Sequence, residues 1–168
     1  MHRSALLILA AALAGPLAAQ TNPAIAEAKQ MYESVKNNLI KAAEKMPEGD
    51  YSYKPTPEQQ TFAQRIAHVA GQARGCSGLI GDPKSVDTSK MEKVALVSAL
   101  KQSFDFCDAA WASMNDKTAV EMVASRGGQR SKLGVLIGNT NHDSELYGYI
   151  SVYLRLKGEV PPSSERGR

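Results

Sequence analysis

The sequence predicts an all-α protein, a four-helix bundle, and three observations support this fold class. Four long segments repeat apolar residues at spacings of three and four, the period of a helix with one buried face. Clusters of proline and glycine separate these segments. No stretch shows a convincing alternation of apolar and polar residues, as a half-buried strand would. The chain has 168 residues, of which 43% are hydrophobic and 22% charged, so we expect one globular domain.

Residues 1–19 are predicted to be a signal peptide, which leaves 20–168 as the domain. Arg3 supplies a positive start, the run 4–15 is apolar, and Pro16 and small residues precede Gln20. This order is typical of a secretory leader. The apolar run is shorter than the roughly 20 residues that span a bilayer. We therefore expect an exported protein, periplasmic or secreted, that does not associate with a membrane after the leader is removed.

The first helix is expected over Pro23–Lys45. Asn22 can cap its N-terminus, and Pro23 suits the first helical turn. The segment 46–50, which contains proline and glycine, ends it.

The second helix follows an extended connector at 51–57, where two prolines disfavour helix. Either Thr56–Gln59 or Thr61–Gln64 matches a capping box, in which two side chains satisfy the free N–H groups of a helix start. The apolar pattern then continues to about Ile80.

The third helix is expected to begin at a capping box, Ser89–Glu92, and to continue to about Asn115. Residues 116–130 are less regular, and we expect a short helix around Val120 followed by a loop at 125–130. The basic, glycine-rich loop lacks the spacing of a phosphate-binding loop.

The fourth helix is expected over Ser131–Lys157. Gly158 suits the position just beyond a helix end, and Pro161–Pro162 prevents the helix from resuming.

The two cysteines, Cys76 and Cys107, fall in the second and third predicted helices. In an exported protein they can form a disulfide, provided that their Cα atoms lie within about 7 Å. The alternatives are two separate buried thiols, which act as small apolar groups, or a catalytic thiol. The residues alone leave the three alternatives open.

Histidine is the most informative residue type, because only His68 and His142 remain after His2 leaves with the leader. One mature chain therefore cannot build a metal site from three histidines. Taken alone, each is an ordinary helical histidine, and His68 has polar neighbours at Arg65 and Gln72. The net charge of +3 falls by one without Arg3, which is too small to indicate a nucleic-acid partner.

Three motifs in this order resemble the DinB-like (YfiT-like) superfamily of metalloenzymes, in its exported subgroup. They are Met46–Pro57, Phe62–Val69 and the C-terminal stretch from Asn141 to Ser163. The resemblance covers nearly the whole mature chain. It implies a four-helix bundle with a long crossover connection and a divalent metal held at one end of the bundle. Homodimers are plausible for this class of bundle.

The resemblance also implies a ligand set, and this chain departs from it. The family places one histidine on the second helix, matched by His68, and an H-x-x-x-H pair on the last helix. His142 matches the first member of that pair, but Leu146 stands at the second position. Residues four apart share a helix face, and leucine has no lone pair to offer a metal.

Three interpretations of the pair stay open. The site is degraded and holds no metal, or His68 and His142 recruit a carboxylate to hold a divalent metal such as Zn or Ni. Glu145 is the better carboxylate candidate, because Asp143 points about 100° away from His142 on an ideal helix. In the third interpretation the imidazoles act without metal, as a general base or as ligand-binding groups.

We therefore predict an exported DinB-like protein of unassigned activity with a degraded metal triad and no resident cofactor. The alternative is a metal-dependent hydrolase or thiol transferase that uses His68, His142 and a third ligand other than histidine. Relatives implied by the resemblance include such enzymes and mycothiol-dependent isomerases. In either case the expected partner is an unidentified small molecule.

Overall fold

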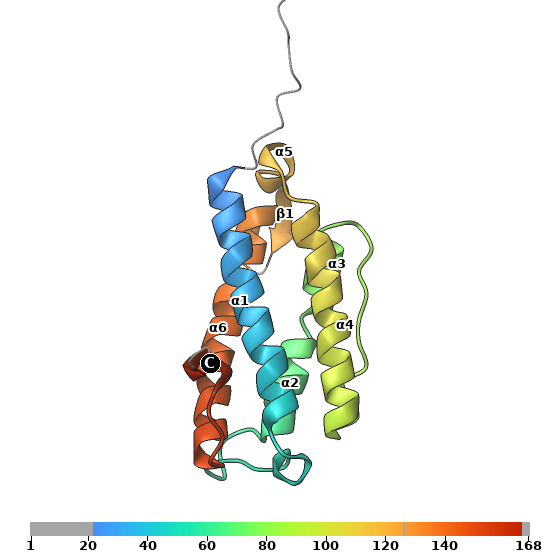
Figure 1. The fold of residues 1–168 in the computed structure, drawn as a ribbon. Coiled ribbons are helices and arrows are strands. Elements are labelled where there is room, and N and C mark those ends of the chain that lie inside the picture. Colours follow the sequence, from blue (N-terminus) through green and yellow to red (C-terminus); the bar gives the residue numbers. More distant parts are fainter. Residues whose placement is uncertain (1–21, 126, 166–168) are drawn as a thin grey trace, which may run out of the picture.

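The computed structural model describes residues 22–125 and 127–165, and it confirms the predicted all-α class apart from one small hairpin (Figure 1). The leader predicted at 1–19 lies outside the described residues. Within the described part of the chain, no helix is both long enough and apolar enough to cross a membrane.

The elements follow one another in a simple order along the chain. They are α1 (Pro23–Lys45), α2 (Phe62–Ala70), α3 (Ala73–Gly78), α4 (Lys93–Ala112), α5 (Asp116–Ala119), β1 (Met122–Ser125), β2 (Gly128–Ser131) and α6 (Lys132–Leu156), with short 3-10 turns at Glu48–Asp50 and Pro162–Ser164.

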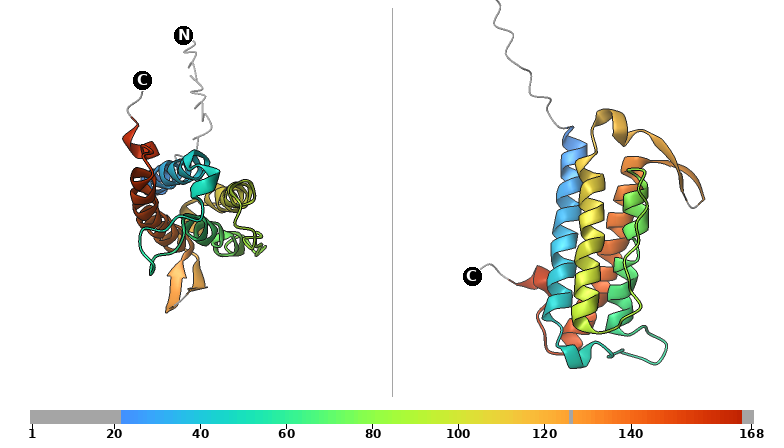
Figure 2. Two further views of the ribbon diagram at one scale, coloured as in Figure 1. Left: turned by 90° about the horizontal axis from the view of Figure 1, so that it is seen from below. Right: turned by 90° about the vertical axis from the view of Figure 1, so that its right-hand side faces the viewer.

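Four columns of helix make the bundle, and α2 with α3 forms one of them (Figures 1 and 2). The segment between α3 and α4 runs back along the length of the bundle, so α4 is parallel to the α2–α3 column. This segment is the predicted long crossover, and α1 and α6 run in the opposite direction. The α5 turn and the hairpin join the far end of α4 to α6.

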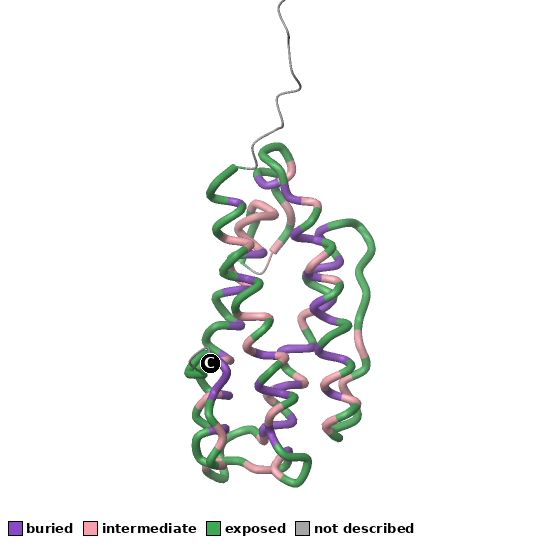
Figure 3. Tube along the Cα trace, viewed as in Figure 1, coloured by how far each residue is buried: buried purple, intermediate pink, exposed green. Residues whose placement is uncertain are grey.

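The core lies where the inner faces of the four columns meet, and buried residues recur along each helix on that side (Figure 3). Tyr32 of α1 stacks on Trp111 of α4 with ring centroids 5.5 Å apart. Leu39, Leu100 and Ile150 are completely buried and bring α1, α4 and α6 together. Full burial of each such side chain contributes about 1.5–3 kcal/mol, so the apolar stripes account for the assembly of the columns.

The two cysteines are joined, with Cα atoms 4.8 Å apart. The disulfide links the six-residue α3 to α4, and both sulfur-bearing residues are buried. Of the three alternatives, the structure therefore supports the disulfide and not the free or catalytic thiols.

The predicted second helix is interrupted rather than continuous. The Thr61–Gln64 capping box starts α2, as one of the two alternatives proposed. The helix then ends at Ala70, and Gly71–Gln72 form a turn before α3 begins. The glycine at 71 lowers the helical preference there, and the disulfide anchors the segment beyond the turn.

The third helix begins at Lys93 and not at the expected Ser89–Glu92 capping box. Ser89 is already engaged, since its hydroxyl and its backbone N–H both donate to the carboxylate of Asp87, at 2.7 and 2.9 Å. The N–H of Lys93 instead donates to Glu48, 45 residues earlier in the chain, at 3.2 Å. A tertiary contact therefore supplies the cap that the local sequence suggested.

The expected loop at 125–130 is wrong, because residues 122–125 and 128–131 pair as antiparallel strands. Gly127 and Gly128 have φ values of 89° and 133°, which only glycine adopts without strain, so they form the tight reversal. Each strand has four residues and little buried surface. The sequence therefore shows no alternation of apolar and polar residues that would predict these strands.

Candidate functional site

His68 and His142 are 74 residues apart in the sequence and meet across the seam between α2 and α6. Their Nε2 atoms are 3.1 Å apart, and the ring planes cross at 75°. Both residues are exposed, and 47% of the His142 side chain is open to solvent. The structure therefore brings together the two histidines that the sequence predicts as site residues.

Local signals in the sequence fix the outward direction of both imidazoles. The capping box starts α2 at Phe62, and the buried stripe of Phe62, Ile66 and Val69 turns His68 toward the surface. Ser131 caps α6 by accepting the N–H of Gly134, and the buried face of that helix, with Leu146 and Ile150, leaves His142 on the outer side. Neither histidine is held in the core, so each can contact an external ligand.

Leu146 lies one helical turn beyond His142 but takes a different environment. Its side chain is 3% exposed and belongs to the continuous apolar core. Position 146, where the resemblance implies a third histidine, is therefore occupied by a leucine packed in the core. That leucine has no atom that can bind a metal.

Glu145 approaches His142 from the side opposite to His68. Its carboxylate oxygen Oε2 is 3.9 Å from Nδ1 of His142, whereas Nε2 of that ring faces His68. The hydroxyl of Tyr149 donates to the other carboxylate oxygen at 3.1 Å. The guanidinium of Arg65 lies over the Tyr149 ring, 4.9 Å from its centroid. As placed, Glu145 contacts the ring nitrogen that points away from the pair.

Asp143 is 1% exposed, in contrast to its neighbour His142. The side-chain amide of Gln72 donates to its Oδ1, while Oδ2 and the amide oxygen of Gln72 have no hydrogen-bond partner. Burial raises the pKa of the Asp143 carboxyl to about 7, and the Gln72 hydrogen bond opposes that rise. The helical period predicts that Asp143 points away from His142, but no local pattern in the sequence indicates its pairing with Gln72.

A row of polar contacts extends along the same seam. The amide of Asn139 donates to the sulfur of Cys76 at 3.6 Å, one turn from the Gln72–Asp143 pair. At the other end, the hydroxyl of Tyr153 donates to the backbone oxygen of Gln60 at 2.6 Å. Polar contacts therefore occur at several points along the seam between the α2–α3 column and α6, from the disulfide to the connector.

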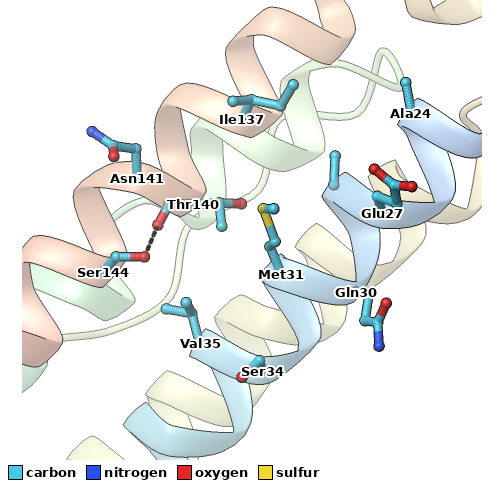
Figure 4. A pocket seen from close by; sticks show the side chains of 11 residues that line it. Ala24, Glu27, Gln30, Met31, Ser34, Val35, Ile137, Thr140, Asn141 and Ser144 are labelled. Carbon is cyan, nitrogen blue, oxygen red and sulfur yellow. Dashed lines mark hydrogen bonds between the residues drawn. The ribbon is translucent and has the colours of Figure 1, made fainter.

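A separate groove of about 850 Å³ lies between α1 and α6 (Figure 4). Met31 of α1 and Ile137 of α6 line it, and they are 65% and 45% exposed. Thr140 and Ser144 line its α6 side, but their hydroxyls donate to backbone oxygens of their own helix. The groove is on a different face of α6 from His142, so it is not part of the histidine site.

The histidine pair fits part of a metal site. Two imidazole nitrogens bound to Zn²⁺ at 2.0–2.1 Å in tetrahedral geometry lie about 3.3 Å apart, close to the observed 3.1 Å. Across residues 22–125 and 127–165, however, no group of three histidine, cysteine, aspartate or glutamate residues is placed to hold a metal ion. The pair supplies two metal ligands, and no residue within the described ranges is placed to supply a third.

No protein-family model matches the sequence, and no curated protein matches it. Several solved structures match the fold. A DinB-like protein from Bacillus cereus ATCC 10987 has a TM-score of 0.68 and 15% identity, over 85% of this chain and 97% of its own. A DinB-like protein from Bacillus subtilis has a TM-score of 0.65 and 16% identity, over 84% of this chain and 99% of its own.

A third solved structure is a mycothiol-dependent maleylpyruvate isomerase. Its TM-score is 0.60 at 17% identity, and the match covers 78% of this chain and 66% of the isomerase. At these identities the likeness is one of fold, and the substrates of the matched proteins do not transfer with it.

Proposed function

We propose, from the premise that this chain has the DinB-like fold, that it is an exported protein whose metal site has degraded to two histidines. The observation that carries the proposal is the Nε2 pair of His68 and His142 at 3.1 Å beside a buried Leu146. The pair keeps two donors in chelating geometry, and the third position has become core.

A site with two imidazoles holds a metal far less tightly than one with three. We expect no resident cofactor, and only weak binding of Zn²⁺ or Ni²⁺ by the Nε2 atoms of His68 and His142. The remaining positions would be open to water or to a ligand. The activity stays unassigned, and the partner we expect is a small molecule.

The second candidate is a metal-dependent hydrolase or thiol transferase, and the chelating distance between the imidazoles favours it. When bound, the metal would lower the pKa of a water or thiol and generate a nucleophile. Glu145 remains the predicted third ligand. It would have to leave Tyr149 and swing around the ring, because its carboxylate now faces Nδ1 of His142.

Metal titration of the mature protein separates these candidates. Wild type should bind about one Zn²⁺ weakly, and His142→Ala should abolish the binding. Leu146→His should increase the affinity for Zn²⁺ at least about tenfold. Leu146→Cys is a second variant with a smaller metal-binding side chain, for the case that the imidazole disrupts the core. Leu156→His is the control, since Leu156 is on the same helix and 56% exposed.

Isothermal calorimetry and circular dichroism would report affinity and folding. Tight binding by wild type would favour the three-ligand enzyme over the degraded site. If Leu146→His and Leu146→Cys both fold and neither binds Zn²⁺ more tightly than wild type, the degraded-triad proposal is contradicted.

Export, absence of nucleic-acid and membrane partners, and homodimer formation stay predictions from the sequence. Mass spectrometry of the native product should show an N-terminus near Gln20, whereas an intact Met1 would contradict the leader. Analytical ultracentrifugation would decide between a monomer and a dimer.

A further inference from the structure

We infer that Glu145 is a positioning residue that keeps the proton of neutral His142 on Nδ1. The Nε2 atom of His142 is then the lone-pair donor of the site, and His68 is the hydrogen-bond donor within the pair. The inference rests on the proposed function and deepens it, because it assigns different roles to two imidazoles that look equivalent in the sequence.

The close contact between the rings requires this asymmetry. A neutral imidazole has one N–H and one lone pair. Because the two Nε2 atoms are 3.1 Å apart, one must carry hydrogen and donate while the other accepts. Two tautomeric arrangements satisfy that condition, and the surroundings of the rings decide between them.

The carboxylate of Glu145 provides the bias. It is 3.9 Å from Nδ1 of His142, too long for a direct hydrogen bond but close enough for its charge to favour hydrogen on that nitrogen. Across the described ranges, His142 is the one imidazole with a carboxylate within 4.0 Å. His142 is therefore the acceptor, and His68 donates from Nε2.

Two further residues hold Glu145 in place. Tyr149, one turn along α6, donates its hydroxyl to Glu145 at 3.1 Å. Arg65 covers the Tyr149 ring from α2 and also donates to Gln59 at 2.8 Å. The cation over the ring and the hydrogen bond to the carboxylate connect α2 and α6 around the histidine pair.

The arrangement predicts an order of engagement. His142 already carries a lone pair on Nε2, which a cation or an acidic proton of a ligand can take by replacing the hydrogen bond from His68. His68 must first move its hydrogen from Nε2 to Nδ1, so it contributes second. Loss of Glu145 should therefore remove the distinction between the rings as well as weaken metal binding.

The deciding experiment is long-range ¹⁵N–¹H NMR of the metal-free protein at about pH 8, where an ordinary imidazole is neutral. Wild type should show His142 with hydrogen on Nδ1 and His68 with hydrogen on Nε2. Glu145→Ala should shift His142 toward the other tautomer, and Tyr149→Phe should produce a smaller shift in the same direction. Glu33→Ala is the matched control, because Glu33 is an exposed helical glutamate that pairs only with Lys29 among the described residues.

An unchanged His142 tautomer in Glu145→Ala, or hydrogen on Nε2 of His142 in wild type, would overturn the inference. Zn²⁺ titration is a separate readout, in which Glu145→Ala should lose about tenfold or more in affinity. If wild type binds no Zn²⁺, the proposed metal function fails, and the tautomer measurement still decides the role of Glu145.

Discussion

At the scale of single residues, one step along α6 separates two different environments. His142 is exposed and faces His68, whereas the next residue, Asp143, is buried against Gln72. A helix turns by about 100° per residue, so adjacent polar residues can take opposite roles. The sequence contained both side chains, but only the packing of α6 against the α2–α3 column decided which of them was buried.

Asp143 should make the protein less stable as the pH rises. Its folded pKa of about 7 lies above its ordinary value of 3.8, so the folded state binds the proton more tightly than the unfolded state. The protonated Asp143 carboxyl contributes fully to the free energy of unfolding below about pH 4. This contribution is lost as the pH rises through about 7, and the total loss is at most about 4 kcal/mol.

Urea unfolding across this range, with a chelator present, should show a shallower pH dependence for Asp143→Asn than for wild type. The difference between the two proteins isolates the contribution of Asp143 from the contributions of all other titratable groups. Parallel curves would show that the carboxyl is ionised without penalty in the fold.

At the scale of elements, helix starts were predictable only where the cap is local. The Thr61–Gln64 box starts α2 as the sequence suggested, since donor and acceptor lie within one turn. The start of α4 depends on Glu48, which is distant in the sequence, and Ser89 is bound to Asp87 instead. The true start of α2 was therefore one of two predicted alternatives, and the start of α4 was predicted too early.

Thr61→Ala should destabilise the protein by about 1 kcal/mol, because it leaves the N–H of Gln64 without its partner at the helix start that presents His68. Thermal unfolding followed by circular dichroism would measure the loss. Ser85→Ala in the exposed crossover is the control and should change the midpoint very little. An equal midpoint for wild type and Thr61→Ala would mean that the cap contributes nothing.

At the scale of the whole molecule, the disulfide joins the two parallel columns. The Cys76–Cys107 bond spans 31 residues and encloses the crossover and most of α4. Its position also anchors α3, which is too short to be stable as an isolated helix. The covalent link therefore holds the α3 end of the column that carries His68.

Reduction of the disulfide should lower the free energy of unfolding by about 3–4 kcal/mol, the loop-closure entropy expected for this separation. Denaturant curves with and without reductant would test this, together with intact mass, which should rise by about 2 Da on reduction. Equal masses would show two free thiols. The double variant Cys76→Ser/Cys107→Ser separates loss of the bond from other effects of the reductant.

The sequence by itself determined the helical class and the four helical segments, because apolar periodicity and local caps act over a few residues. The long crossover and the interest of the two histidines came from the resemblance of its motifs to the DinB-like superfamily. The sequence could not determine the Gly71–Gln72 break, the burial of Asp143 or the position of Arg65 over the Tyr149 ring. Those features depend on contacts between distant segments: Cys76 with Cys107, Gln72 with Asp143, and Arg65 with Tyr149. Tertiary packing decided them because each contact stabilises its members only after the columns have assembled.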